Sequence, residues 1–309
     1  MGYKIGDYFD FSEFFDKQIL DPPPIGSIIK YNDARTKPYY KHIIFVEGCT
    51  DKIFYSNTNI DTFKDNAYYI YSTKKENAEY VGKEGVFHAY HSIQSDNALL
   101  DDFEKCIFII DRDWDERIVS ENHFIKKYDI PSFTVTFGHS MENYFLELDN
   151  LKIIFDMYHI QDDYDYFANC YIQYVNETAD YWAYKATLSY AKKEKLFFSY
   201  KKDKSFEDIF DFRYIDNKII YNKDFYNSEV ELMKSGINYS LQLMDKYELN
   251  KEKIINEPRF VRGHDAFRYL KVYLKEKHGI DFDFWGQNEK LFKMIISKLN
   301  VNIDVKTQE

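Results

Sequence analysis

The chain has few of the residues expected of an extracellular or membrane protein. Its 309 residues include three cysteines, an odd number without a C-x-x-C pair, which argues against a disulfide framework or a structural zinc site. No uninterrupted apolar run approaches the roughly 20 residues needed to span a bilayer, and the first residues lack the apolar core of a signal peptide. We therefore expect a cytoplasmic protein that makes no membrane contact.

Positive charge is also scarce. Lysine and arginine number 41 against 52 aspartates and glutamates, which gives a net charge of −11. This balance argues against a general nucleic-acid coat, because non-specific phosphate binding depends on lysine and arginine. It does not exclude a nuclease that meets phosphates with a metal ion and one local basic patch. The motif G-x-x-x-x-G-K-[ST] is absent, so the sequence has no P-loop for binding ATP.

The periodicity of apolar residues divides the chain into three parts. Residues 1–40 read as a mixed lead-in, residues 41–150 as an α/β domain, and residues 151–309 as a mainly helical domain. In the α/β domain, β-α-β-α-β-α-β order predicts a small, Rossmann-like parallel sheet with helical crossovers. The strands are expected at 42–47, 67–71, 106–110 and 132–137, and the helices near 50–57, 86–100 and 118–127. In the helical domain, helices are expected at 164–194, 226–247, 262–278 and 287–299, with an extended stretch at 213–221.

Acidic residues follow two of these expected strands. Glu47 comes directly after the first strand, and Asp111 and Asp113 follow the third. Because the carboxyl ends of parallel strands share one edge of a sheet, the three carboxylates are expected to lie together. Close carboxylates repel one another unless a cation neutralises them, and oxygen ligands suit Mg²⁺ or Mn²⁺. The sequence therefore predicts a hard-metal site.

The D-x-D pattern also occurs in three other kinds of protein, but each of them leaves part of this sequence unexplained. A calcium-binding EF-hand loop would require glycine at Glu116 and glutamate at Asn122. A haloacid-dehalogenase-type phosphatase would favour threonine or valine at Asp115, and a D-x-D nucleotide-sugar transferase would not require Val46-Glu47-Gly48. A phosphatase-like hydrolase remains a weaker alternative.

The combination resembles TOPRIM, the catalytic module of topoisomerases, primases and several nucleases. The resemblance rests on Val46-Glu47-Gly48, with Asp51 after it, and on the later Asp111-Arg112-Asp113. It implies a TOPRIM-like sheet in which Glu47, Asp111 and Asp113 bind one or two Mg²⁺ (or Mn²⁺) for phosphodiester cleavage, with Glu47 a possible proton acceptor.

A third motif narrows the resemblance, and its residues are His139-Ser140-Met141-Glu142-Asn143-Tyr144. Together with the other two motifs it resembles a TOPRIM-like family of about 300 residues, related to OLD-family nucleases. The best-known role of this family is the nuclease effector of PARIS anti-phage systems. This family implies a toxin held inactive by an ABC-type, OLD-like ATPase encoded nearby. In the studied members of the family, the released effector cleaves host transfer RNA. A homodimer is expected as the active form, because homodimers are the commonest oligomers. Asp115 and Glu142 match secondary acidic positions, which the family uses near the metal. A helix-start carboxylate is the alternative for Glu142.

Two basic stretches are candidates for nucleic-acid contact. The first contains Arg259, Arg262 and Arg268 with His264, a candidate general acid or base; Gly263 to Asp265 are expected to open a helix, whose N-terminus favours phosphate. Ion pairs with the surplus acids are the alternative for these arginines. The second stretch has Phe197, Phe198 and Tyr200 between its lysines and could contact RNA, or could be a solvated loop. Its candidate contacts are Lys192, Lys193, Lys201 and Lys202.

Two further functions stay open at the level of sequence. One is a DNA-nicking nuclease of the OLD kind, because nothing in the residues separates RNA from DNA as substrate. The other is a non-catalytic interaction subunit bound to an ATPase, with a vestigial metal site. The intact set of acidic residues argues against the second, since a decayed site would tolerate asparagine or serine.

Overall fold

A computed structural model describes most of the chain from residue 42 onward. The described residues are 42–60, 68–72, 82–95, 106–111, 133–136, 138–201, 206–238, 240–284 and 289–301. They divide into two compact units. One unit holds the described residues up to Asp111, together with 133–135 and Val301, and the other holds those from Thr136 to Asn300. Residues 136–150, which the sequence assigned to the α/β domain, thus belong to the second unit.

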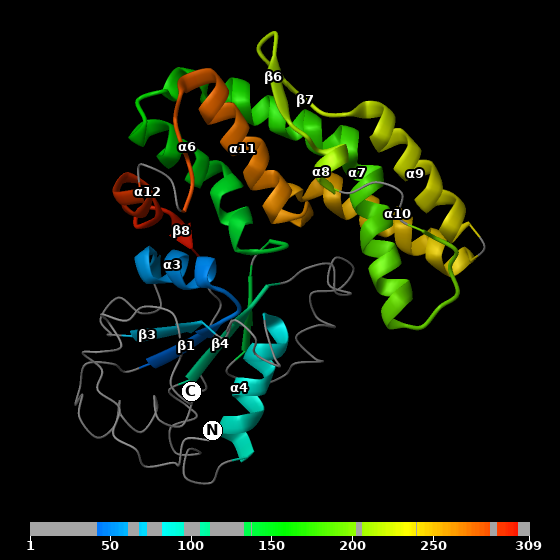
Figure 1. Cartoon of the computed structure of the whole chain (residues 1–309), viewed down its shortest axis with the longest axis horizontal. Helices are drawn as coiled ribbons and strands as arrows, with labels where there is room; N and C mark the ends of the chain where they lie inside the picture. The colour runs from blue at the N-terminus through cyan, green and yellow to red at the C-terminus, as the bar shows by residue number, and fades with distance from the viewer. Residues whose placement is uncertain are drawn as a thin grey trace. The chain divides into compact units, whose positions relative to one another are not determined.

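The first unit is built on a four-stranded sheet in the order β3-β1-β4-β5, with every neighbouring pair parallel (Figure 1). The parallel sheet expected from the sequence is confirmed, and each strand begins within one residue of its predicted start. The strands are β1 (His42–Val46), β3 (Tyr68–Ser72), β4 (Cys106–Ile110) and β5 (Phe133–Val135). The predicted helix at 118–127 lies outside the described residues.

The two central strands are apolar because both of their faces are covered. All five residues of β4 are buried, and so are the last three of β1. The rings of Phe45 and Phe108 stack across the two strands at 5.0 Å, and Tyr90 of a crossover helix meets Phe108 edge-on at 5.4 Å. Continuous apolar runs of this kind are typical of parallel strands with helices on both sides. The crossover helices are α3 (Cys49–Asn57) and α4 (Lys83–Ser95), and a short strand β2 (Asn59–Ile60) follows α3.

The second unit is helical and is organised along one 30-residue helix, α7 (Tyr164–Lys193). Helices α9 and α10 pack along α7 (Figure 1). The buried rings of Tyr181 and Trp182 on α7 contact the ring of Phe210. A second aromatic cluster surrounds Phe145. The helices are α6 (Leu148–Met157), α8 (Phe206–Ile209), α9 (Lys223–Ile237), α10 (Leu241–Asn256), α11 (Gly263–His278) and α12 (Glu289–Ile296), with short 3-10 turns η3 (Met141–Leu146), η4 (Gln161–Asp163) and η5 (Pro258–Phe260).

One expected helix is wrong. The sequence predicted a single helix at 226–247, but α9 ends at Ile237 and α10 begins at Leu241. Ser240 is the reason, because its hydroxyl accepts a hydrogen bond from the backbone N–H of Leu243 and so caps a new helix. The other expected helices of this unit correspond to α7, α11 and α12. The extended stretch expected at 213–221 is the antiparallel hairpin β6 (Arg213–Ile215) and β7 (Lys218–Ile220).

The chain returns to the first unit at β8 (Asn300–Val301). Within the part of the chain that the structure describes, none of the helices combines the length and the apolar character needed to cross a bilayer.

Candidate functional site

Glu47 and Asp111 lie side by side at one edge of the sheet. Glu47 directly follows β1, Asp111 directly follows β4, and these strands are hydrogen-bonded neighbours. The backbone N–H of Asp111 donates a hydrogen bond to Glu47 Oε1 over 2.8 Å. Both residues are half-buried. The structure thus brings together two predicted ligands that are 64 positions apart in the sequence.

This edge is the topological switch point of the sheet. From β1 the chain continues to β3 on one side, whereas from β4 it continues to β5 on the other side. The connections therefore leave the boundary between β1 and β4 in opposite directions. In open α/β sheets, ligands bind outside the carboxyl ends of the strands at such a point. The predicted acidic residues lie where the topology favours a ligand site.

A glycine and a helix start complete the surroundings of Glu47. Gly82 immediately precedes α4 and has a φ of +59°, a conformation that side chains rarely adopt. A Cβ at Gly82 would lie 3.6 Å from Glu47 Oε2. The N-terminal end of α4, where the helix dipole is positive, is therefore near this carboxylate. On the turn after β1, a Cβ at Gly48 would lie 3.0 Å from Oδ2 of the buried Asp51, so this position also has little room for a side chain.

The structure describes only some of the predicted metal ligands. Asp113 and Asp115 lie outside them, so their positions relative to Glu47 and Asp111 stay predictions. Among the residues that are described, no group of three or more His, Cys, Asp and Glu side chains could hold a metal ion. Glu142 belongs to the other unit.

In the second unit, two sequence motifs that are distant along the chain form one cluster. The side chain of Asn143, on η3, is buried and accepts a hydrogen bond from the backbone N–H of Ser140 at 2.9 Å. Its amide group donates to the backbone carbonyl of Val261 at 3.1 Å, just before α11 begins. The N–H of His139 donates to the carbonyl of Arg259 at 2.9 Å. These two hydrogen bonds fasten the segment His139–Asn143 to the segment Arg259–His264.

Glycines allow the two segments of this cluster to approach closely. A Cβ at Gly138 would lie 2.4 Å from Cβ of Asn143, and one at Gly263 would lie 2.2 Å from Oγ of Ser140. The expectation that Gly263 opens a helix is confirmed, because α11 starts there. Ser140 and Asn143 fill the space beside Gly263. This space is at the N-terminal end of α11, where the sequence suggested that a phosphate could bind.

Glu142 and His264 form a pair in the same cluster. Nδ1 of His264 lies 3.1 Å from Glu142 Oε1, and the hydroxyl of Ser140 donates to Glu142 Oε2 at 2.6 Å. Burial opposes ionisation of Glu142, but the hydrogen bonds from His264 and Ser140 outweigh it, so the pKa of this carboxyl is lowered. The hydrogen bond to Glu142 raises the pKa of His264 despite partial burial. Both oxygens of Glu142 are engaged by protein groups.

Replacing Glu142 with glutamine is therefore expected to lower the pKa of His264 toward its ordinary value of about 6.5. In the wild type, the ion pair is complete between the lowered pKa of Glu142 and the raised pKa of His264. Its stabilising contribution is lost as the pH rises through the pKa of His264, and also as the pH falls through that of Glu142. An NMR titration of the His264 ring measures the shift. An unchanged titration in Glu142→Gln would contradict the pairing, and Glu207→Gln, remote in sequence, is the control.

The three arginines of the first basic stretch are in ion pairs. Arg259 pairs with Glu257 at 2.5 Å, and Arg262 with Asp265 at 3.2 Å. Arg268 lies 3.8 Å from the same Asp265, whose side chain is almost fully buried. Burial raises the pKa of Asp265 even though both arginines oppose the shift. The arginines thus compensate the buried Asp265 and the half-buried Glu257, and phosphate contact by them stays a prediction.

The lysines of the second basic stretch are placed differently. Lys192 lies in the last turn of α7 and Lys201 lies beyond it, and both side chains are exposed. Lys193 is the last residue of α7, and Lys202 lies outside the described residues. Neither Lys192 nor Lys201 takes part in an ion pair within the described part of the chain. These side chains stay available for a ligand.

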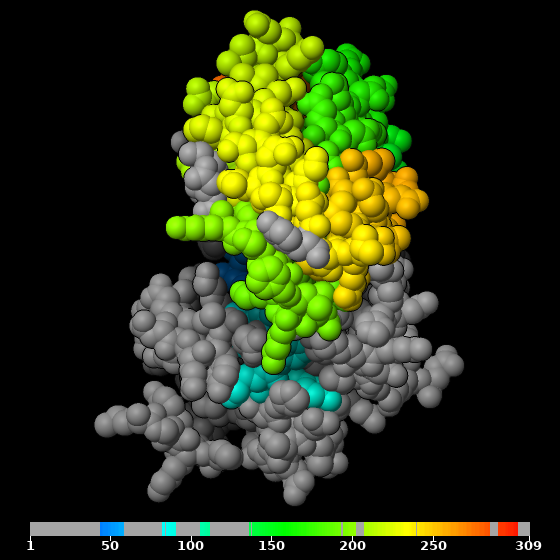
Figure 2. Space-filling model, turned by 90° about the vertical axis from the view of Figure 1, so that its right-hand side faces the viewer, coloured from blue at the N-terminus to red at the C-terminus, as the bar shows by residue number. Residues whose placement is uncertain are grey.

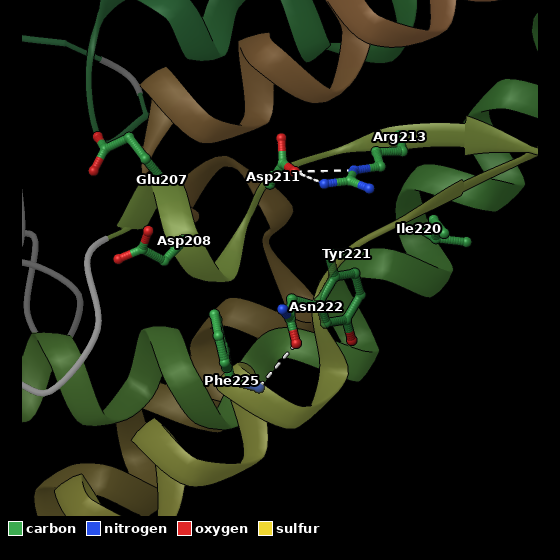
Figure 3. A pocket seen from close by; sticks show the side chains of 8 residues that line it. All are labelled: Glu207, Asp208, Asp211, Arg213, Ile220, Tyr221, Asn222 and Phe225. Atoms are coloured by element: carbon green, nitrogen blue, oxygen red, sulfur yellow. Dashed lines mark hydrogen bonds and ion pairs between the residues drawn. The ribbon is translucent and has the colours of Figure 1, made fainter.

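A hollow of about 390 Å³ lies beside the β6–β7 hairpin (Figure 3). The figure shows the carboxylates of Glu207 and Asp208 on one side and the ion pair of Asp211 with Arg213 on another, with Phe225 below. Three carboxylates against one guanidinium make this hollow unfavourable for phosphate. None of the residues predicted to form the site lines it.

Sequence reasoning missed two parts of these arrangements. Gly82 was not a candidate, although a glycine directly before a helix, in Gly82-Lys83, is a signal for a close approach. The fastening of Asn143 to Val261 was also missed, and no local signal could have found it, because 118 positions separate the two residues. Comparison of the sequence with protein-family models and with curated proteins gave no match.

Proposed function

We propose that this protein is a metal-dependent phosphodiester hydrolase whose centre is the pair Glu47 and Asp111, joined by Asp113. The observation that carries the proposal is the hydrogen bond of 2.8 Å between Glu47 Oε1 and the N–H of Asp111, at the switch point of a parallel sheet. The ends of two buried strands place these two acidic residues side by side there. Ionised carboxylates that lie close together repel one another, so a cation bound between them would favour this arrangement.

The residues at this edge fit Mg²⁺. This ion is usually held by one or two carboxylates together with water and substrate phosphates, without a complete cage of protein ligands. Glu47 and Asp111 supply two oxygen donors, and Asp113 follows Asp111 by two residues. The absence of a cluster of three acidic or histidine side chains among the described residues is compatible with such an ion.

Each residue has a defined part in the proposed reaction. When bound, Mg²⁺ would supply positive charge against the phosphate oxygens of an in-line displacement. Glu47 is oriented by the N–H of Asp111, and its carboxylate is proposed to hold the ion and to accept a proton from the attacking water. Gly82 keeps side-chain atoms away from the carboxylate of Glu47, and Gly48 leaves the turn after β1 without a side chain.

At a finer level, we propose that the sheet is a TOPRIM-like module and that the chain is a nuclease effector of a PARIS-type defence system. This part of the proposal rests on the motifs Val46-Glu47-Gly48, Asp111-Arg112-Asp113 and Glu142-Asn143-Tyr144. It includes a partner ATPase that holds the nuclease inactive, a homodimer as the active form, and transfer RNA as substrate. An ATPase gene found next to the gene of this protein, and recovery of a complex after co-expression of the two, would support the partner.

Cleavage by the purified protein is expected to require a divalent cation. Incubation with labelled RNA and DNA is expected to give new ends with Mg²⁺ or Mn²⁺ and none after treatment with a chelator. Restoring the metal ion should restore cleavage. Sequencing the new ends after incubation with total cellular RNA would then identify the substrate.

Two outcomes would count against the proposal. Cleavage that persists in the chelator would exclude the metal-dependent mechanism. A folded protein that cleaves neither polymer with any divalent cation, but binds the ATPase, would favour an interaction subunit.

A further inference from the structure

The segment from Lys192 to Lys201 reverses the charge of the chain locally. Between positions 192 and 201 there are four lysines and one acidic residue, in a protein with a net charge of −11. Figure 2 shows the end of α7 and the chain that follows it, in yellow-green, on the surface that faces the viewer. We call residues 192–201 the lysine–aromatic segment.

The segment begins with a helix ending that holds its backbone firmly. The N–H of Leu196 donates to the carbonyl of Ala191 at 2.9 Å, and that of Lys195 to the carbonyl of Lys192 at 3.3 Å. This pair of bonds is a Schellman motif, in which the left-handed position is usually glycine. Here it is Lys195, with a φ of +53°. Lys195 therefore occupies a left-handed backbone position at which glycine would have lower conformational strain.

The other end of the segment is anchored to α9. The N–H of Ser199 donates to the carbonyl of Gly236 at 3.1 Å, and a Cβ at Gly236 would lie 2.3 Å from the carbonyl oxygen of Ser199. The hydroxyl of Tyr200 donates to the buried carboxylate of Glu229, and Lys185 lies over the Tyr200 ring. The backbone is therefore fixed on both sides of the residues between these anchors.

Phe197 lies between the two anchors and is not packed into the core. Its side chain is 77% exposed, whereas Phe198 and Tyr200 are half-buried. Leaving a phenylalanine ring in water forgoes the free energy that its burial would contribute to folding. A ring held by a fixed backbone with its face exposed is an arrangement suited to stacking with a flat ligand.

Three exposed lysines lie close to Phe197 in the sequence. Lys192, Lys195 and Lys201 are all exposed, and none is in an ion pair with another described residue. This contrasts with Arg259, whose charge is compensated by Glu257. Lys201 follows Phe197 by four positions, which limits the distance between their Cα atoms to about 14 Å. The chain therefore keeps these lysines within a few residues of the exposed ring.

We propose that the lysine–aromatic segment binds single-stranded nucleic acid, with the Phe197 ring stacking on an unpaired base and Lys192, Lys195 and Lys201 contacting phosphates. Only an unpaired base offers a free face to the ring, and the phosphates on either side of it match the lysines. The inference rests on the proposed function only in treating the bound strand as a substrate. Binding itself requires no metal ion.

The test measures fluorescence anisotropy of labelled 20-nucleotide RNA and DNA, single-stranded and duplex, with the full-length protein in a chelator. Single strands are expected to bind more tightly than duplexes. Phe197→Ala and Phe197→Leu should each weaken single-strand binding roughly five- to a hundred-fold, whereas Phe197→Trp should retain it. Leucine keeps an apolar side chain without an aromatic face, so it separates stacking from general apolar contact.

The lysines are tested with a matched control for charge. Replacing Lys192, Lys195 and Lys201 together with glutamine should weaken binding and reduce the slope of log affinity against log salt by about 2. The same change at three other exposed lysines of this unit should leave binding within about twofold of wild type; these are Lys152, Lys218 and Lys275. Lys195→Gly should bind more weakly although it is more resistant to thermal unfolding.

Several results would overturn the inference. One is a Phe197→Leu protein that binds single strands with wild-type affinity. Another is a control triple variant whose binding weakens as much as that of the Lys192, Lys195 and Lys201 variant. A third is that the Phe197 variants lose a co-purified protein and keep their binding of nucleic acid. The proposed function can be contradicted independently of this inference. Strong Phe197-dependent binding by a protein that never cleaves would support this inference and contradict the nuclease, whereas metal-dependent cleavage with binding unaffected by Phe197 would do the reverse.

Discussion

Replacing Glu47 with glutamine is expected to reduce the rate of metal-dependent cleavage by about three orders of magnitude, or ~4 kcal/mol of activation free energy. Glutamine has the same shape as glutamate and no negative charge. It therefore removes a metal ligand and the proposed proton acceptor without opening a cavity. The rate is measured with labelled nucleic acid at saturating Mg²⁺.

The same substitution is expected to leave the fold unchanged. The amide oxygen of glutamine can still accept the hydrogen bond that Glu47 Oε1 accepts from the N–H of Asp111. Circular dichroism and the unfolding midpoint of Glu47→Gln should therefore match the wild type. Glu207→Gln, which makes the same chemical change in the acidic hollow, is the control and should retain full activity. Full activity of a folded Glu47→Gln protein would refute the metal-nuclease proposal.

The sheet could be predicted because its strands are buried on both faces. The runs that became β1 and β4 are continuous and apolar, and each is followed by an acidic residue at its carboxyl end. Such a pattern is typical, in an α/β protein, of a central parallel strand with polar residues at its edge. The proximity of Glu47 and Asp111 followed from that reasoning, and the structure bears it out.

The helical unit was less predictable because its contacts are not local. The break between α9 and α10 depends on Ser240, one cap residue within a long stretch of helical periodicity. Ion pairs of the arginines with surplus acids, in contrast, were an alternative that the sequence already offered. The pairs of Asp265 with Arg262 and Arg268 are local, with i, i+3 spacing. The link between Asn143 and Val261 joins segments with no shared pattern, so only the folded chain reveals it.

The second large effect is expected at Asn143. Replacing it with alanine should lower the free energy of unfolding by about 2–4 kcal/mol, because two buried backbone groups would lose their partners. These are the N–H of Ser140 and the carbonyl of Val261. Each unsatisfied buried group costs about 1–3 kcal/mol. Urea unfolding followed by circular dichroism measures the change.

The surface offers a matched control, since Asn227 is exposed in the middle of α9 and Asn227→Ala should change stability by less than about 0.5 kcal/mol. Equal stability of the two variants would contradict the fastening of η3 to the start of α11. The fastening also positions the pair of Glu142 and His264, because these residues flank Asn143 and Gly263. Asn143→Ala is therefore expected to lower the pKa of His264 as well, in the same direction as Glu142→Gln. A loss of stability without that shift would mean that Asn143 supports the fold but does not hold the acid and the histidine together.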